Sequence, residues 1–237
     1  MVQPMIRFTL FGVPVAIHPS LWITLALFGG LLSVHSMDGL YRTALFVIAG
    51  FFCLLVHEMG HALVGRKLGG GCPMVFLAWL GGGCVNEGAV FTRGRGILMT
   101  AAGPLFSLLP GLLALGFFLL YVGDAAQCLE LAGGILFGHQ VSVVPVFEAS
   151  TMLLIFMQYM LQISFWWAVL NLIPIFPLDG GQIMSGLMDS ERLVHLISLI
   201  VAIVLMLLCL IMGFWILAIL LGFLAHLNYR GIRQAEH

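Results

Sequence analysis

Long apolar runs dominate the chain, and short segments that carry most of the charges separate them. A run of about 20 apolar residues can cross a bilayer as a helix. The pattern predicts spans near 21–34, 43–65, 96–122 and 151–172, and then an unbroken run over 193–227. As one helix that last run would be about 52 Å long, which exceeds the hydrocarbon core of about 30 Å. We therefore predict two spans that turn near Gly213, with one long tilted helix as the alternative.

Basic residues favour a total of six spans. They lie between the second and third spans, after the fourth span and after the last, at Arg66, Lys67, Arg93, Arg95, Arg192, Arg230 and Arg233. Positive residues mark the cytoplasmic side of a membrane protein. Six spans place all of these residues, Arg7 and both termini inside, whereas five would leave Arg230 and Arg233 outside. Arg42 is an exception under either count.

Composition agrees with a membrane protein. The chain is 62% hydrophobic and 8% charged, with a mean hydropathy of +1.14, whereas soluble domains are about 25% charged. A net charge of −1 provides no basic surface for nucleic acid. The predicted fold is an all-α polytopic membrane protein with about six transmembrane helices. We expect a single domain over 1–237, embedded in the lipid bilayer, with core spans at about 43–65, 96–122 and 151–184.

Two segments have β character. Apolar and polar residues alternate over positions 6–10, which predicts a short strand that Gly12 and Pro14 interrupt. Residues 74–80 and 84–91 flank three glycines and predict a hairpin near the cytoplasmic face. A free edge of this hairpin could accept unwound substrate by strand addition. Alternatively, the hairpin only plugs the cytoplasmic mouth of the site.

The sequence HEMGH at 57–61 lies inside the second apolar run. On a helix, HExxH places His57 and His61 one turn apart on one face, where both can bind one Zn²⁺. Glu58 lies between them, where it can take a proton from a water on the metal. His57 is about 14 Å along the helix from Arg66, so the metal is expected within the membrane, nearer the cytoplasmic face. Ionisable residues in a membrane are costly and are usually functional.

Asp179 is the best candidate for a third ligand. It follows a segment in which Pro174 and Pro177 break the fourth span, and two glycines come after it. Irregular backbone at membrane depth is tolerated only where protein or a water-filled cavity covers it. An acidic residue on such a segment has the reach to approach a metal. Taken alone, Asp179 could instead cap a helix.

These elements together resemble a known family. HEMGH in one span, AAGP in the next and NLIPIFPLDGG after another resemble the site-2 proteases, which are polytopic intramembrane zinc metalloproteases. The resemblance covers about 8–184. It implies that His57, His61 and Asp179 bind Zn²⁺ and that Glu58 is the general base. It also implies that Asn171 has a catalytic role and holds the substrate or the oxyanion.

The chain departs from the family pattern in two respects. Relatives often carry Asn four residues after the Gly of the AGP element, where this chain has Ser107. A second polar substrate contact in the third span therefore does not carry over. Neither a PDZ domain nor a CBS module fits, because only residues 123–150 separate the third and fourth spans. The chain resembles a minimal, membrane-only member.

An alternative role for Asn171 is structural. Its side chain could form a hydrogen bond with the backbone group that Pro174 leaves unpaired.

The predicted function is hydrolysis of peptide bonds in membrane-spanning substrates by an intramembrane zinc metalloendopeptidase. The expected substrate is a single-pass transmembrane protein, and the expected location is a bacterial or archaeal cell membrane. The alternative is a non-proteolytic zinc-binding membrane protein, either a metal transporter or an inactive scaffold. Glu58 favours the protease, because a transporter needs no general base between its ligands. The remaining histidines lie singly in the sequence and offer no second metal cluster.

Overall fold

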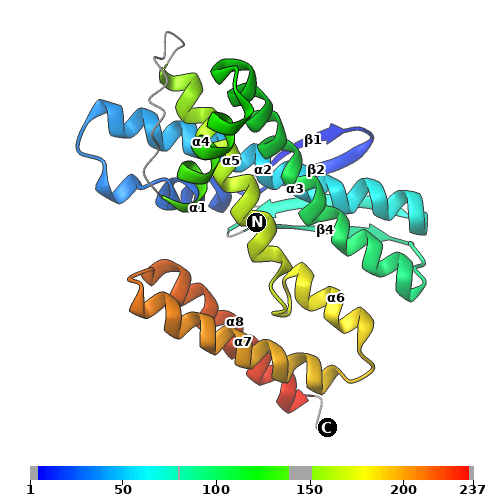
Figure 1. The fold of residues 1–237 in the computed structure, drawn as a ribbon. Coiled ribbons are helices and arrows are strands. Elements are labelled where there is room, and N and C mark those ends of the chain that lie inside the picture. Colours follow the sequence, from blue (N-terminus) through cyan, green and yellow to red (C-terminus); the bar gives the residue numbers. More distant parts are fainter. Residues whose placement is uncertain (1–4, 80, 139–150, 235–237) are drawn as a thin grey trace.

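A computed structural model describes residues 5–79, 81–138 and 151–234 (Figure 1). In chain order the elements are β1 (Ile6–Leu10), β2 (Val13–Ile17), α1 (Ser20–Phe28), a 3₁₀ turn (Leu31–Ser33), α2 (Met37–Gly69), β3 (Cys72–Ala78), β4 (Gly81–Glu87), α3 (Arg93–Val122), α4 (Ala125–Phe137), α5 (Thr151–Leu172), α6 (Asp179–Leu187), α7 (Glu191–Ile211) and α8 (Trp215–Gln234). The predicted fold class, mainly helical with a small sheet, is confirmed.

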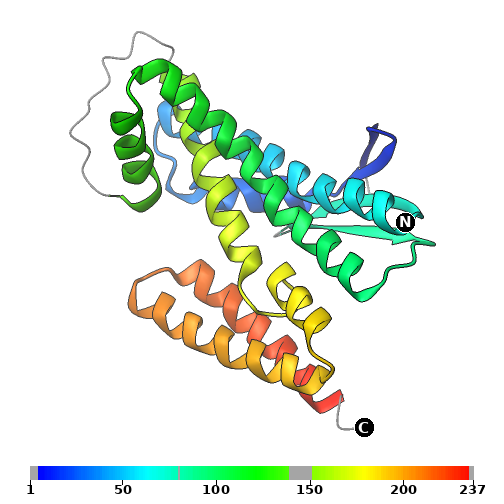
Figure 2. The ribbon, with the colours of Figure 1, turned by 45° about the vertical axis from the view of Figure 1, so that its right-hand side comes forward.

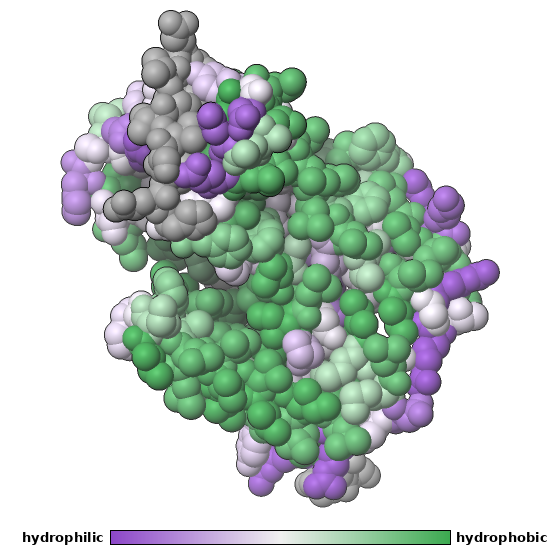
Figure 3. Space-filling model, in the orientation of Figure 1, coloured by the Kyte–Doolittle hydropathy of each residue, from purple (hydrophilic) through white to green (hydrophobic). Residues whose placement is uncertain are grey.

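Within the described residues, five helices are long and apolar enough to cross a membrane, one fewer than the six predicted, namely α2, α3, α5, α7 and α8. Much of their surface is apolar and not covered by the rest of the chain. Figure 3 shows a broad apolar face with polar residues gathered at opposite edges. Long apolar helices with an apolar outer surface are typical of proteins that lie in lipid. The chain is therefore a multi-pass integral membrane protein.

The C-terminal apolar run forms two helices, as predicted. Helix α7 ends at Ile211 and α8 begins at Trp215. Gly213 between them has a φ of +80°, a backbone conformation that glycine adopts without a steric penalty. At the other end of α7, the Ser190 side chain accepts a hydrogen bond from the Leu193 N–H and caps the helix.

The first predicted span is shorter than expected, because α1 ends at Phe28 after nine residues. Strand β2 and the short helix α1 follow each other in this part of the chain instead. Arg66 of α2 donates to the Phe11 carbonyl just before β2, and Thr43 of α2 donates to the Gly29 carbonyl just after α1. Between Thr43 and Arg66, α2 rises about 35 Å. The segment 11–29 thus runs beside a membrane-crossing length of α2.

The four strands form one sheet in the order β1-β2-β3-β4, in which β2 and β3 are parallel and the other pairs antiparallel. Alternate residues of β2 and β3 are buried and pack against α2, among them Val15, Val75 and Leu77. Pro14 lies inside β2 and does not interrupt it. The predicted hairpin is present, but Gly81, Gly82 and Gly83 belong to strand β4 and not to the turn.

Helices α7 and α8 form a hairpin that lies apart from α2 and α3, and α6 with its flanking loops connects the two parts (Figures 1 and 2). An apolar core holds the hairpin together, with Ala202 of α7 and Leu221 of α8 almost fully buried. Ile175, from the segment between α5 and α6, is 0% exposed in the same core. The irregular segment before Asp179 is therefore packed on the hairpin.

Candidate metal centre

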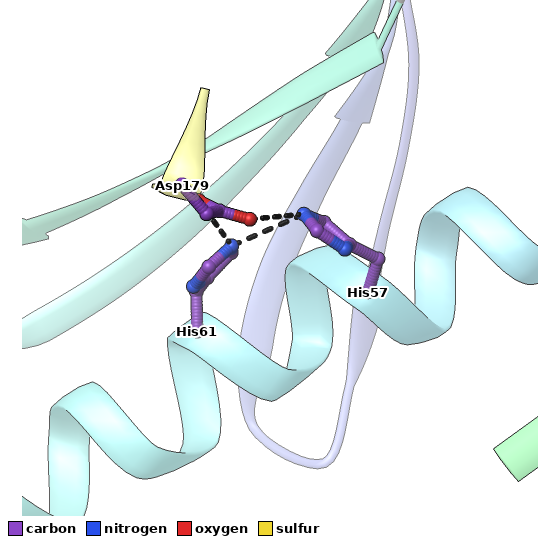
Figure 4. Close-up of side chains that lie close together, drawn as sticks. All are labelled: His57, His61 and Asp179. Atoms are coloured by element: carbon purple, nitrogen blue, oxygen red, sulfur yellow. Dashed lines mark hydrogen bonds and ion pairs between the residues drawn. The ribbon is translucent and has the colours of Figure 1, made fainter. Parts of the chain in front are cut away.

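Three side chains from two helices meet inside the protein. His57 and His61 lie one turn apart in the middle of α2, and Asp179 is the first residue of α6. All three are buried and point toward one another (Figure 4). The two Nε2 atoms are 3.1 Å apart, and the Asp179 oxygens lie 3.2 Å from His57 Nε2 and 3.4 Å from His61 Nε2. The Asp179 carboxylate therefore faces the histidines and does not cap α6.

Hydrogen bonds on the far side of each ring fix its tautomer. The Ser107 hydroxyl donates its single proton to the Gly103 carbonyl, so at 2.8 Å it accepts a hydrogen bond from His57 Nδ1–H. His61 Nδ1–H donates to the Met99 carbonyl at 3.0 Å. In neutral rings both Nε2 atoms then present lone pairs. These lone pairs face each other and a carboxylate, an arrangement that needs a positive charge between them.

The three donors fit a zinc ion. Tetrahedral Zn²⁺ with bonds of about 2.0–2.1 Å places its ligand atoms about 3.3 Å apart. The two Nε2 atoms are near this spacing, and one donor atom from each of the three residues lies within 4.8 Å of the other two. Asp179 Oδ2 is buried and has no hydrogen-bond donor among the described residues. With both imidazoles neutral, the two negative charges of Asp179 and Glu58 would balance the charge of one Zn²⁺. Such balance is needed because an uncompensated charge is costly inside a protein. Three protein ligands leave one position open for water or substrate, which is typical of a catalytic site.

The three residues border a cavity of about 730 Å³. Glu58 lines it and is 5% exposed, with its Oε1 3.9 Å from His57 Nε2. The opposite wall comes from α8, through Leu220, Phe223, Leu224 and Leu227. Strand β4 forms a further wall. A Cβ on Gly82 would lie 2.7 Å from Glu58 Cγ, so the glycine lets this strand approach the carboxylate.

Asn171 also lines the cavity and is 7% exposed. Its amide donates to the carbonyl of Trp167, one turn earlier in α5. In a regular helix the N–H of residue 174 would donate to the Leu170 carbonyl, but Pro174 has no N–H. The Ile173 N–H donates to this carbonyl instead. The amide of Asn171 therefore does not bond to the carbonyl that Pro174 leaves free, and it shares the cavity with His57, His61 and Asp179.

Sequence reasoning missed the role of α3. Ser107, noted only as a departure from the family pattern, is 0% exposed and orients His57. A Cβ on Gly103 would lie 2.1 Å from His61 Nε2, so the AAGP element must carry glycine here. Met99 contributes only its backbone carbonyl, which no sequence pattern reveals. Ser107 lies four residues after Gly103, and this helical spacing is the one signal that could have indicated a shared face.

Fold and site together define a class of membrane-embedded proteins in which an HExxH motif and an aspartate form a candidate metal centre. The chain belongs to peptidase family M50, whose sequence profile matches residues 45–212. It is 24% identical over 184 residues to Zinc metalloprotease MJ0392 of Methanocaldococcus jannaschii, a match that covers 78% of this chain and 45% of that protein. The chain thus spans about half the length of this relative.

A solved structure shares the fold. The structure entitled Site-2 Protease from Methanocaldococcus jannaschii superposes with a TM-score of 0.56 at 23% sequence identity, and the match covers 99% of this chain and 96% of that chain. At this identity the likeness supports the arrangement of the helices and sheet. The chemistry of this chain depends on its own residues.

Proposed function

We propose that this protein is an intramembrane zinc metalloprotease that hydrolyses peptide bonds of membrane-spanning substrates. One observation carries the proposal: Glu58, a buried carboxylate, shares one cavity with the three metal-binding side chains. Family membership and the names of the two similar proteins support it. Buried charge in an apolar protein is costly, and a metal-dependent hydrolysis accounts for all four groups.

Each residue has a defined task in this reaction. His57, His61 and Asp179 would hold Zn²⁺, which supplies Lewis acidity toward the substrate carbonyl and lowers the pKa of water. Glu58 takes a proton from the attacking water as general base. Asn171, on the cavity wall, is proposed to donate a hydrogen bond to the substrate carbonyl or to its developing oxyanion.

The proposed substrate is a single-pass transmembrane protein that reaches the cavity as extended chain, because a helix hides its carbonyls in its own hydrogen bonds. In the described sheet, β4 is a terminal strand and pairs only with β3. Its residues 81–84 line the cavity. These two facts favour strand addition by unwound substrate over a hairpin that only plugs the site.

We further propose that the active site lies nearer the cytoplasmic face of a bacterial or archaeal cell membrane. The basic residues Arg66 and Lys67 end the helix that carries His57 and His61. Arg93 and Arg95 begin α3, the next helix along the chain. This concentration of positive charge at one end of α2 and α3 supports a cytoplasmic location for that end.

Replacing Glu58 with Gln tests the reaction. The variant keeps the size of the side chain but lacks the base, so zinc should remain bound while proteolysis stops. Membrane proteomes would be compared between cells that produce the native protein and cells that produce Glu58→Gln. The comparison looks for new peptide termini that lie within predicted transmembrane spans. Such ends should appear only with the native protein. Equal cleavage by both proteins would overturn the mechanism, and no cleavage by the native protein would favour a zinc-binding scaffold or transporter.

A further inference from the structure

The backbone of Phe176, three residues before Asp179, is held by side chains of the α7–α8 hairpin. Its N–H donates to Ser198 Oγ of α7 at 3.0 Å. Its carbonyl accepts from Asn228 Nδ2 of α8 at 2.6 Å. Phe176 lies in the irregular segment between α5 and α6, where no helical partner satisfies these groups. The hairpin therefore supplies the hydrogen bonds that this segment lacks.

The polar groups of Asn228 are fully used. Its second N–H donates to the Leu224 carbonyl at 2.9 Å, and its Oδ1 accepts from His195 Nδ1–H at 2.9 Å. The carbonyls of Phe176 and Leu224 can only accept, so the network fixes the orientation of the amide. Asn228 is 1% exposed, and a buried amide with every group paired specifies one arrangement of its neighbours.

The surrounding packing is shaped to this network. A Cβ on Gly231 would lie 2.6 Å from the His195 ring, so glycine lets the imidazole lie directly against α8. Ser198 is 0% exposed. The neighbouring Ile175 inserts its side chain into the apolar core of the hairpin. Both the backbone and the side chains of the segment before Asp179 are thus anchored on α7 and α8.

We propose that Asn228 is a positioning residue for the metal ligand Asp179, acting through the Phe176 backbone with Ser198 and His195. The proposal rests on the metal centre of the proposed function. Helices α2 and α3 hold His57 and His61, whereas the third ligand enters from a segment that the hairpin anchors. Packing of α6 on α3, where a Cβ on Gly186 would lie 2.8 Å from Ile97, supports Asp179 from its other side.

Zinc affinity of the full-length purified protein tests this role. Asn228→Leu has nearly the same size but leaves the Phe176 carbonyl and His195 Nδ1–H unpaired. Loss of groups that orient metal ligands typically costs 10–100-fold in metal affinity, and we expect at least a tenfold loss in competition with a chromogenic chelator. Protein loaded with Co²⁺ should also show an altered visible spectrum, because the spectrum reports ligand geometry.

Met206→Ala is the control. It removes packing between α7 and α8 toward the Gly213 turn, where a Cβ on Gly222 would lie 3.2 Å from Met206 Sδ, without touching the network. Its melting temperature should fall while zinc affinity and the cobalt spectrum stay native. Equal loss of affinity in Met206→Ala, or native affinity in Asn228→Leu, would overturn the proposal. If Asn228→Leu does not fold, Ser198→Ala decides in the same way. A native protein that binds no zinc would instead overturn the metal centre itself.

Discussion

Ser107 of α3 holds the imidazole of His57 of α2 in place, with Oγ 2.8 Å from Nδ1. The same hydroxyl donates to the Gly103 carbonyl, so it can only accept from the ring. The lone pair of His57 Nε2 is thereby directed at His61 and Asp179. The orientation of the His57 ring toward the other two candidate ligands thus depends on the contact between α2 and α3.

Ser107→Ala should weaken zinc binding about 10- to 100-fold, because the variant leaves Nδ1–H of His57 without its acceptor and frees the ring to turn. Chelator competition on purified protein measures the change. Ser164→Ala is the control, since Ser164 is 1% exposed and lies 3.4 Å from Cys53 Sγ, away from the metal ligands. Native affinity in Ser107→Ala would show that the hydrogen bond is dispensable.

Gly103→Ala should abolish zinc binding, because the new Cβ would lie 2.1 Å from His61 Nε2 and the ring must move. Gly116→Ala on the same helix is the matched control, with no neighbouring atom within 4 Å of the added methyl. Alanine is generally favoured over glycine in a helix by about 1 kcal/mol, so this variant should be at least as stable as the native protein. Metal-to-protein ratios that remain equal in the two variants would contradict the prediction.

Purified protein should contain about one zinc per chain, measured by elemental analysis. The double variant His57→Ala/His61→Ala should contain almost none, since two of three ligands are gone. His226→Ala, which removes an exposed histidine of α8, should keep a full complement. Zinc retained by the double variant would place the metal elsewhere.

Removal of the metal from the native protein should abolish proteolysis reversibly. Treatment with a chelator would leave Glu58 and the cavity in place but withdraw the Lewis acid, so cleavage of a membrane substrate should stop. Added Zn²⁺ should restore it, whereas Mg²⁺ should not, because a His-rich donor set favours zinc over a hard oxygen-seeking cation. Activity that persists at zinc contents near zero would rule out a metalloprotease.

The turn between α7 and α8 returns the chain to the side of the membrane on which α7 begins. The basic residues mark this side as cytoplasmic, so the C-terminus should lie in the cytoplasm. A fluorescent protein that matures only in the cytoplasm should glow when it is fused after His237. Alkaline phosphatase inserted at Gly213 should be active, because that turn would face the outside. The reverse pair of results would invert the orientation derived from the basic residues, while the metal centre would be unaffected.

Local patterns in the sequence predicted the three candidate ligands and the five long apolar helices. Residues four apart lie on one face of any helix, which places His57 beside His61. Apolar run lengths identified the long helices but also predicted a first span that the structure replaces with a strand and a short helix. Two prolines and the following glycines marked the segment that carries Asp179. The four-residue spacing from Gly103 was available as a sign that Ser107 shares its helical face, but it does not reveal what that face meets.

Only the tertiary structure decided which distant residues support the site. The bond from Ser107 to His57 depends on how α2 packs on α3, and the network of Asn228 depends on how the hairpin meets Phe176. The strand and short helix that replace the first predicted span depend on pairing β2 with β3. Such contacts join residues far apart in sequence, and their geometry follows from packing of whole elements, which no local period or composition encodes.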